Sequence, residues 1–131
     1  MPFYHALVRP GLLSEAERQA FARDVVDVHC DVTGAPPSFV HTLVTDSDDL
    51  PTGSNAVVNG TIRAGRTPDQ KAEIETRLDA ALAATARVDI ATVHTSTRDI
   101  QASYTMEGGV LLPEPGSAEE RAWGNATQQA S

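Results

Sequence analysis

The first residues of the sequence carry a group that could act as an acid or a base. Met1 is followed directly by Pro2, and removal of Met1 would leave a prolyl secondary amine at the start of the chain. This amine gives up a proton when charged and offers a lone pair when neutral, and burial lowers its pKa by disfavouring the charged form. Residues 3–8 are rich in aromatic and branched side chains, so they predict a core strand that would fix the amine inside the fold. The alternative is that Pro2 only permits removal of Met1.

Two arginines form a second candidate group. Arg63 lies at the end of a predicted strand, and Arg66 lies just before Thr67, the expected N-cap of a helix. Two guanidinium groups and the positive end of a helix could converge on one carboxylate. The pattern therefore predicts a carboxylate clamp. The alternative is a pair of solvated loop arginines, or of partners for some of the eighteen acidic residues.

A histidine late in the first predicted helix is the third candidate. His29 follows the apolar Val28 by one residue and Val25 by four, which places it at the edge of the buried helix face. In such a position a lone histidine is more often a hydrogen-bonded boundary residue than a substrate ligand. The chain carries three further histidines without an evident pattern: His5, His41 and His94.

The elements that would position these groups repeat a β-α-β pattern twice. Ser14 with Glu17, and Thr67 with Gln70, are capping boxes that mark the starts of two helices. We expect the first helix over roughly 14–33 and the second from 67 to about 87. Strands are expected over 2–9, 38–45, 56–64 and 89–97.

Helices of this length allow the strands that they join to lie parallel. The predicted fold class is therefore α/β (α+β), with two fused β-α-β units forming a four-stranded sheet and both helices on one face. The first unit covers about 2–46 and the second about 56–97. In the tail, 99–131, the glycines and prolines predict a hairpin, followed by a short helix around 118–123.

Composition narrows the class of protein. The 131 residues suit a single domain spanning 1–131. Ten Lys and Arg against eighteen Asp and Glu give a net charge of −8, which repels phosphate backbones and anionic lipids. We therefore expect neither nucleic acid nor membranes as partners. With no secretion signal and no run approaching a membrane span, the sequence predicts a soluble, cytoplasmic protein.

Few large core residues are available to a chain of this length. It has three Phe, two Tyr and one Trp, and the single Cys30 excludes an internal disulfide. A short chain with these features gains stability by association. We therefore expect an oligomer.

Three stretches of the sequence resemble the cis-3-chloroacrylic acid dehalogenase family of the tautomerase superfamily. They are Met1-Pro2 running into a strand, Ile-Arg-Ala-Gly-Arg-Thr at 62–67, and Leu-Leu-Pro-Glu-Pro-Gly at 111–116 ahead of Trp123. Their order and spacing also fit, so the resemblance covers residues 2 to about 123. It implies a tautomerase-like fold that assembles as a homotrimer, a small carboxylate substrate, and no metal or organic cofactor.

The resemblance also implies roles for the candidate residues. Pro2 would be the acid and base, Arg63 and Arg66 would bind the substrate carboxylate, and His29 would help to hold the substrate. Members of this family add water to small unsaturated acids, releasing halide where one is present, or tautomerise enol acids such as phenylenolpyruvate.

Water activation in the family needs a glutamate near the C-terminal tryptophan and a tyrosine just before the Leu-Leu-Pro stretch. Two extra residues after Gly116 leave two candidates for the glutamate: Glu119, which we favour, and Glu120. The tyrosine position is Gly108, and the nearest phenol is that of Tyr104. We assign Glu119 and Tyr104 as candidate catalytic residues on this basis.

This departure from the family pattern decides which activity we expect. Tautomerisation needs only Pro2 and the clamp, whereas hydration also needs a positioned, deprotonated water. The sequence therefore predicts a tautomerase with weak hydratase or dehalogenase activity. Two alternatives stay open: a catalytically silent trimeric binding module, and a decarboxylase of 3-oxo acids.

Overall fold

The computed structural model describes residues 1–123, which are built around a four-stranded mixed sheet in the order β2-β1-β3-β4. Strand β1 runs parallel to β2, β3 runs parallel to β4, and the central pair β1 and β3 is antiparallel. Each parallel pair is joined by a long helix, as parallel strands require. The predicted pair of fused β-α-β units is therefore confirmed. The strands are β1 (Phe3–Val8), β2 (His41–Asp46), β3 (Ala56–Arg63) and β4 (Val93–Ile100).

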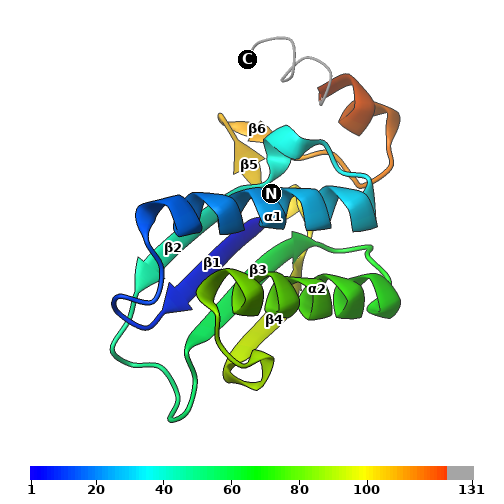
Figure 1. Ribbon diagram of the computed structural model, residues 1–131. Helices are drawn as coiled ribbons and strands as arrows, with labels where there is room; N and C mark the ends of the chain where they lie inside the picture. The colour runs from blue at the N-terminus through cyan, green and yellow to red at the C-terminus, as the bar shows by residue number, and fades with distance from the viewer. Residues whose placement is uncertain (124–131) are drawn as a thin grey trace.

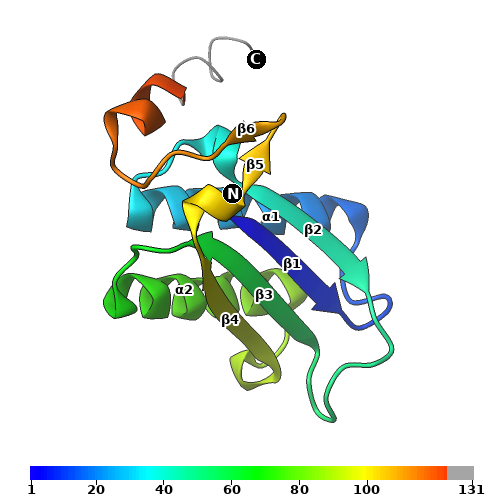
Figure 2. The ribbon, with the colours of Figure 1, turned by 180° about the vertical axis from the view of Figure 1, so that it is seen from behind.

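Both long helices, α1 (Glu15–Thr33) and α2 (Pro68–Ala86), cover the same face of this sheet (Figures 1 and 2). Both predicted capping boxes are present, with side-chain to backbone hydrogen bonds in each direction at Ser14 and at Thr67. Helix α1 ends at Gly34, whose φ of 74° is easily adopted by glycine. Local sequence signals therefore fix both helices close to their predicted bounds.

The core lies between the sheet and the two helices. Alternate side chains of β1 point toward the helices and are fully buried, as the strand period of two requires. The helices contribute one apolar stripe each. The core side chains include Tyr4, Ala6, Val8, Phe21, Val25, Val58, Ile62, Ile74, Leu78 and Leu82.

Two of the predicted strands begin later than the sequence suggested. Short 3-10 turns, η1 (Pro37–Phe39) and η2 (Ile90–Thr92), replace the first residues of the strands expected at 38 and 89. In the first turn Pro37 is pre-set for a helical start. In the second, the Asp89 carboxylate accepts a hydrogen bond of 3.0 Å from the backbone N–H of Ala91. The apolar residues in these turns are typical of a strand, which is why the sequence predicted one. Pro37 and the Asp89 cap stabilise a 3-10 turn instead.

The C-terminal segment returns to the chain's N-terminus. After η3 (Ala102–Tyr104), strands β5 (Met106–Glu107) and β6 (Val110–Leu111) form the predicted hairpin, and residues 118–123 form the predicted short helix. Figures 1 and 2 show the hairpin beside the start of β1. Residues 124–131 of the predicted tail lie outside the described residues.

The sheet face opposite the helices is not covered by any element of residues 1–123 (Figure 2). It carries apolar side chains among polar ones, and Phe3 and Leu43 are 41% and 44% exposed. Within the same residues, no helix combines the length and the apolar character needed to cross a bilayer.

Candidate active site

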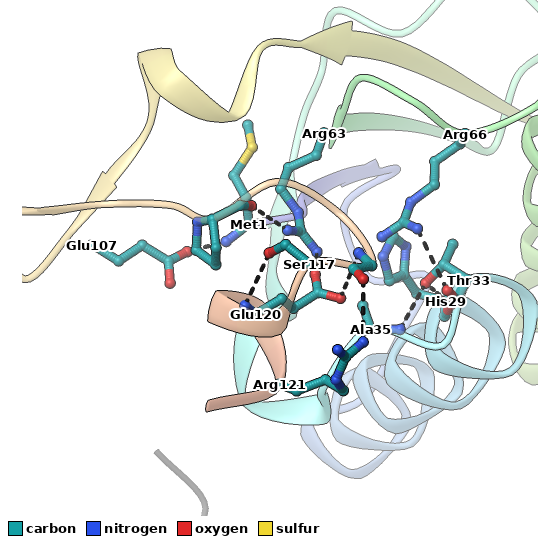
Figure 3. Close-up of polar contacts among 12 residues, drawn as sticks. Met1, His29, Thr33, Ala35, Arg63, Arg66, Glu107, Ser117, Glu120 and Arg121 are labelled. Carbon is teal, nitrogen blue, oxygen red and sulfur yellow. Dashed lines mark hydrogen bonds and ion pairs between the residues drawn. The ribbon is translucent and has the colours of Figure 1, made fainter. Parts of the chain in front are cut away.

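The N-terminus lies at the centre of the candidate site. Pro2 is buried at the start of β1, and its carbonyl accepts a hydrogen bond of 3.0 Å from the backbone N–H of His41 in β2. The Met1 ammonium group pairs with the Glu107 carboxylate of the hairpin (Figure 3). Burial lowers the pKa of this amine, although Glu107 acts in the opposite direction. The sheet therefore holds the chain terminus in a partly desolvated position.

Arg63 lies beside the N-terminus, at the end of β3, and is 2% exposed. Its guanidinium donates to the Pro113 carbonyl at 2.6 Å and to the Glu120 carboxylate (Figure 3). The guanidinium carbon also lies 5.4 Å from the centre of the Phe39 ring, at cation–π distance. One buried arginine thus connects the central sheet with the C-terminal tail.

The two glutamates of the short helix have different surroundings. Glu120 is buried, and its second carboxylate oxygen accepts from the backbone N–H of Gly116 at 3.0 Å. Glu119 is exposed and borders a hollow of about 890 Å³ between the hairpin and this helix, with Leu111 and Trp123 among its other walls. The structure therefore brings Glu120 to Arg63, whereas Glu119, which the sequence comparison favoured, faces the outer hollow.

Arg66 follows β3 in the loop before α2 and is half-buried. One terminal nitrogen lies 3.4 Å from the Thr33 carbonyl oxygen at the end of α1. Its Nε is buried without a hydrogen-bond partner in residues 1–123. Burial, followed by the nearby charge of Arg63, lowers the pKa of its guanidinium. Arg66 thus has an N–H donor that no group in residues 1–123 accepts. Arg63, by contrast, donates to the C-terminal tail.

His29 lies on the sheet-facing side of α1 and is 2% exposed. Its Nδ1 lies 2.7 Å from the hydroxyl oxygen of Tyr4 in β1. Burial, and then the positive charges of Arg66, Arg63 and the N-terminus, lower the pKa of His29 to about 3. His29 is therefore neutral at pH 7, and Figure 3 shows its ring beside the guanidinium of Arg66.

Tyr104 stands apart from these residues. Its side chain is 74% exposed and lines a hollow with Arg98, Asp99 and Gln101 near the end of β4. Within the described part of the chain, this hollow shares no wall residue with the one beside Glu119. The structure therefore brings Pro2, His29, Arg63 and Arg66 together and leaves Tyr104 outside.

Two residues of the site were not assigned from the sequence. Strand alternation marks Tyr4 as a buried residue, but it cannot show that the phenol meets His29. Glu107 is separated from Met1 by 106 positions in the chain, and only the folded hairpin brings them together. Among the described residues, no group of three His, Cys, Asp or Glu side chains is placed to hold a metal ion.

A comparison with models of protein families shows to which family this chain belongs. The family model "Putative oxalocrotonate tautomerase enzyme" matches residues 1–128. The chain belongs to this family. Its expected membership of the tautomerase superfamily, and its tautomerase-like fold, are thereby confirmed.

Solved structures agree with the tautomerase assignment. The protein N1, a member of the cis-3-chloroacrylic acid dehalogenase family, is 25% identical, with a TM-score of 0.84 over 97% of this chain and 99% of its own. Native Ps01740 is 32% identical, with a TM-score of 0.74 over 80% of this chain and 99% of its own. The Q0 fused 4-OT, a symmetric trimer, is 24% identical, with a TM-score of 0.76 over 84% and 94% of the two chains. No functionally curated protein matches this chain in sequence.

Proposed function

We propose that the Met1-free protein is a tautomerase that moves a proton on a small enol carboxylic acid, with the amine of Pro2 as acid and base. The observation that carries this proposal is the position of Arg63, Arg66 and His29 in one cluster with the partly buried chain terminus (Figure 3), within a tautomerase fold. Burial lowers the pKa of the terminal amine when Met1 is present. Pro2 is itself buried, so the same desolvation would lower the pKa of its amine once Met1 is removed and bring its proton exchange toward neutral pH.

The reaction needs one proton donated and one removed. The protonated Pro2 amine would give its proton to the carbon of the enol double bond while the enol C–OH becomes a carbonyl. The proton released from the enol oxygen would return to the amine directly or through water. No other group has to change its charge, which suits a site whose histidine stays neutral.

The substrate carboxylate is assigned mainly to Arg66. Its Nε has no partner in residues 1–123, and it directly precedes the N-cap of α2, so the positive helix end adds to its charge. Arg63 is already bound to Glu120 and to the Pro113 carbonyl. It supplies positive charge and holds the tail in place.

Hydration and dehalogenation are expected to be weak. The nearest phenol candidate, Tyr104, is 74% exposed, and Gly108 stands at the position where the family carries a tyrosine. Glu120 uses its two carboxylate oxygens for Arg63 and Gly116, and Glu119 faces the outer hollow. In the part of the chain that the structure describes, the hollows beside Glu119 and Tyr104 share no wall residue, so we expect no glutamate–phenol pair to orient and deprotonate a water.

A homotrimer is part of the proposal. The uncovered sheet face carries Phe3 and Leu43, each about two-fifths exposed, and the related fused 4-OT is a symmetric trimer. Size-exclusion chromatography with light scattering should give the mass of three chains. A monomeric mass would contradict this part of the proposal.

The central test is ketonisation of phenylenolpyruvate by protein whose intact mass shows that Met1 has been removed. The Pro2→Ala variant, checked by the same mass measurement, should lose about 10²-fold or more in kcat, a typical contribution of a positioned acid or base. The mass matters because a retained Met1 turns the Pro2 nitrogen into an amide.

The outcomes separate the competing functions. Equal activity of wild type and Pro2→Ala would overturn the role of Pro2. No activity on enol acids from Met1-free protein would favour the silent binding module. Carbon dioxide release from malonate semialdehyde without ketonisation would favour a decarboxylase, and fast chloride release from 3-chloroacrylate without ketonisation would overturn the ranking of the activities.

A further inference from the structure

We infer that Tyr4 is a positioning residue, whose hydroxyl holds His29 in the tautomer that presents an Nε2–H donor beside Arg66. This inference rests on the proposed function, because it gives the neutral His29 a defined task in binding an acid. The inference adds Tyr4 to the site residues, although the sequence analysis did not assign Tyr4 a role there.

The contact between the two side chains is buried and well defined. Tyr4 is fully buried in β1 and His29 is 2% exposed in α1. The hydroxyl oxygen and Nδ1 are 2.7 Å apart, and the rings meet edge to face with centres 5.7 Å apart. Within residues 1–123, this is the only side-chain hydrogen bond of His29. The hydroxyl therefore controls one edge of the imidazole and leaves Nε2 on the other.

Strand β3 leaves room for the Tyr4 ring beside it. Tyr4 pairs in register with Gly60 of β3. A Cβ atom at position 60 would lie 2.6 Å from Cε1 of the Tyr4 ring and 2.9 Å from Cδ1, well inside normal contact. The missing side chain at Gly60 thus lets the phenol lie where its hydroxyl reaches α1.

The chemistry of the two groups sets the direction of the hydrogen bond. Burial raises the pKa of Tyr4, so the phenol keeps its proton. The pKa of His29, lowered to about 3, keeps the imidazole neutral with one ring nitrogen free to accept. An imidazole nitrogen is a better acceptor than a phenol oxygen, and a phenol is a better donor than a neutral imidazole. The hydroxyl therefore donates to Nδ1, and the ring proton is on Nε2.

This tautomer gives the site a donor without another charge. Figure 3 shows the His29 ring next to the guanidinium of Arg66, and the charges of Arg66 and Arg63 both act on it. A neutral Nε2–H can bind an oxygen of an acid held by Arg66. A histidinium there would add a third cation to the two arginines and oppose protonation of the Pro2 amine.

The first test uses ¹⁵N NMR of the free protein, which requires no substrate and no activity. We expect long-range ¹H–¹⁵N correlations of His29 to show a protonated Nε2 and a hydrogen-bonded, unprotonated Nδ1. Tyr4→Phe should shift the Nδ1 resonance and mix the two tautomers. A protonated Nδ1 in the wild type, or an unchanged pattern in the variant, would overturn the inference.

The second test is a double-mutant cycle on ketonisation. Tyr4→Phe should lower kcat/KM by about fivefold to tenfold, as expected for one lost hydrogen bond, but should have no further effect in a His29→Ala background. Equal losses in both backgrounds would overturn the inference, because Tyr4 would then act independently of His29. A failure of the proposed function is recognised separately, by an active Pro2→Ala variant.

A matched control removes a similar hydrogen bond elsewhere. Away from the site, the Thr97 hydroxyl of β4 donates to the Glu75 carboxylate of α2 at 2.8 Å. Thr97→Val should leave kcat/KM and the His29 resonances unchanged. A loss as large as that in Tyr4→Phe would show a general effect of the sheet and would contradict the positioning role.

Discussion

The Glu120 carboxylate and the Arg63 guanidinium form an ion pair inside the fold, although 57 positions separate them in the chain. Their side chains are 9% and 1% exposed. The pair joins the end of β3 to the last helical turn, and the Gly116 N–H and the Pro113 carbonyl complete the hydrogen bonding of the two charges. Removing one partner leaves the other charge buried without compensation.

The first prediction concerns this pair and stability. Glu120→Ala should lower the free energy of unfolding by about 3 kcal/mol, since it leaves the buried Arg63 charge unpaired. Glu119→Ala is the matched control, because Glu119 is the exposed neighbour and its loss should change the value by less than about 0.5 kcal/mol. Urea denaturation measures both. Equal effects of the two substitutions would contradict the structural role of Glu120.

The second prediction separates the two arginines. Arg66→Ala should raise KM for an enol acid about tenfold to hundredfold with little loss of stability, since its Nε is unpaired in residues 1–123 and an ionic hydrogen bond contributes about 1.5–3 kcal/mol. Arg66→Lys should recover part of the loss, because it keeps the charge but not the planar donor fork. Steady-state kinetics gives the result.

Arg23, exposed on α1, is the control for net charge. Arg23→Ala should leave KM unchanged in low-salt buffer. If it raised KM as much as Arg66→Ala, the effect would come from the overall charge of the protein, and the assignment of Arg66 to the carboxylate would be wrong.

Most of the fold could be predicted from short sequence patterns such as helix caps, whereas the candidate site could be predicted only in part. Capping boxes at Ser14 and Thr67 fixed the starts of both helices, because a cap depends on residues three positions apart. The choice between Glu119 and Glu120 depends on how the last turn packs against Arg63. Spacing along the chain cannot decide such a contact, and counting favoured the residue that is exposed.

The same limit applies to Tyr104 and Tyr4. Tyr104 was proposed because it lies near the family's tyrosine position in the sequence, yet the 3-10 turn before the hairpin leaves it 74% exposed. Tyr4 was predicted only as part of a core strand. Its contact with His29 crosses from the sheet to α1, and neither periodicity nor composition encodes that distance.

The third prediction tests how tightly the sheet packs below the Tyr4 ring. Gly60→Ala should lower the free energy of unfolding by about 1–3 kcal/mol, since the new methyl group would overlap ring carbons of a fully buried side chain. Tyr4→Phe should not relieve this loss, because phenylalanine keeps the same two carbons. Thermal or urea unfolding of the two single variants and of the double variant measures these changes in the free energy of unfolding.

A control for this substitution lies on the adjacent strand. Ser96 is exposed on β4, and Ser96→Ala should change stability by less than about 0.5 kcal/mol. A neutral Gly60→Ala variant would mean that the Tyr4 ring has room to move, and this would weaken the argument that Gly60 holds the phenol against α1.

The last prediction concerns the pH dependence that His29 imposes on stability. The pKa of its imidazole is about 3 in the folded protein and about 6.5 in an unfolded chain. Below pH ~6.5 the unfolded state therefore binds a proton that the folded state does not accept until pH ~3. The free energy of unfolding should fall with decreasing pH across this window, approaching about 1.4 kcal/mol per pH unit.

Urea denaturation between pH 7.5 and pH 5 tests this effect above the range where most carboxylates titrate. These two pH values are roughly one unit above and 1.5 units below the unfolded histidine pKa. His29→Gln should flatten the dependence, because glutamine takes up no proton in either state. The same substitution at the exposed His94 should leave the slope as it is in the wild type. A His29→Gln variant with an undiminished slope would show that His29 takes up a proton in the folded protein, and its role as a neutral donor would then fail.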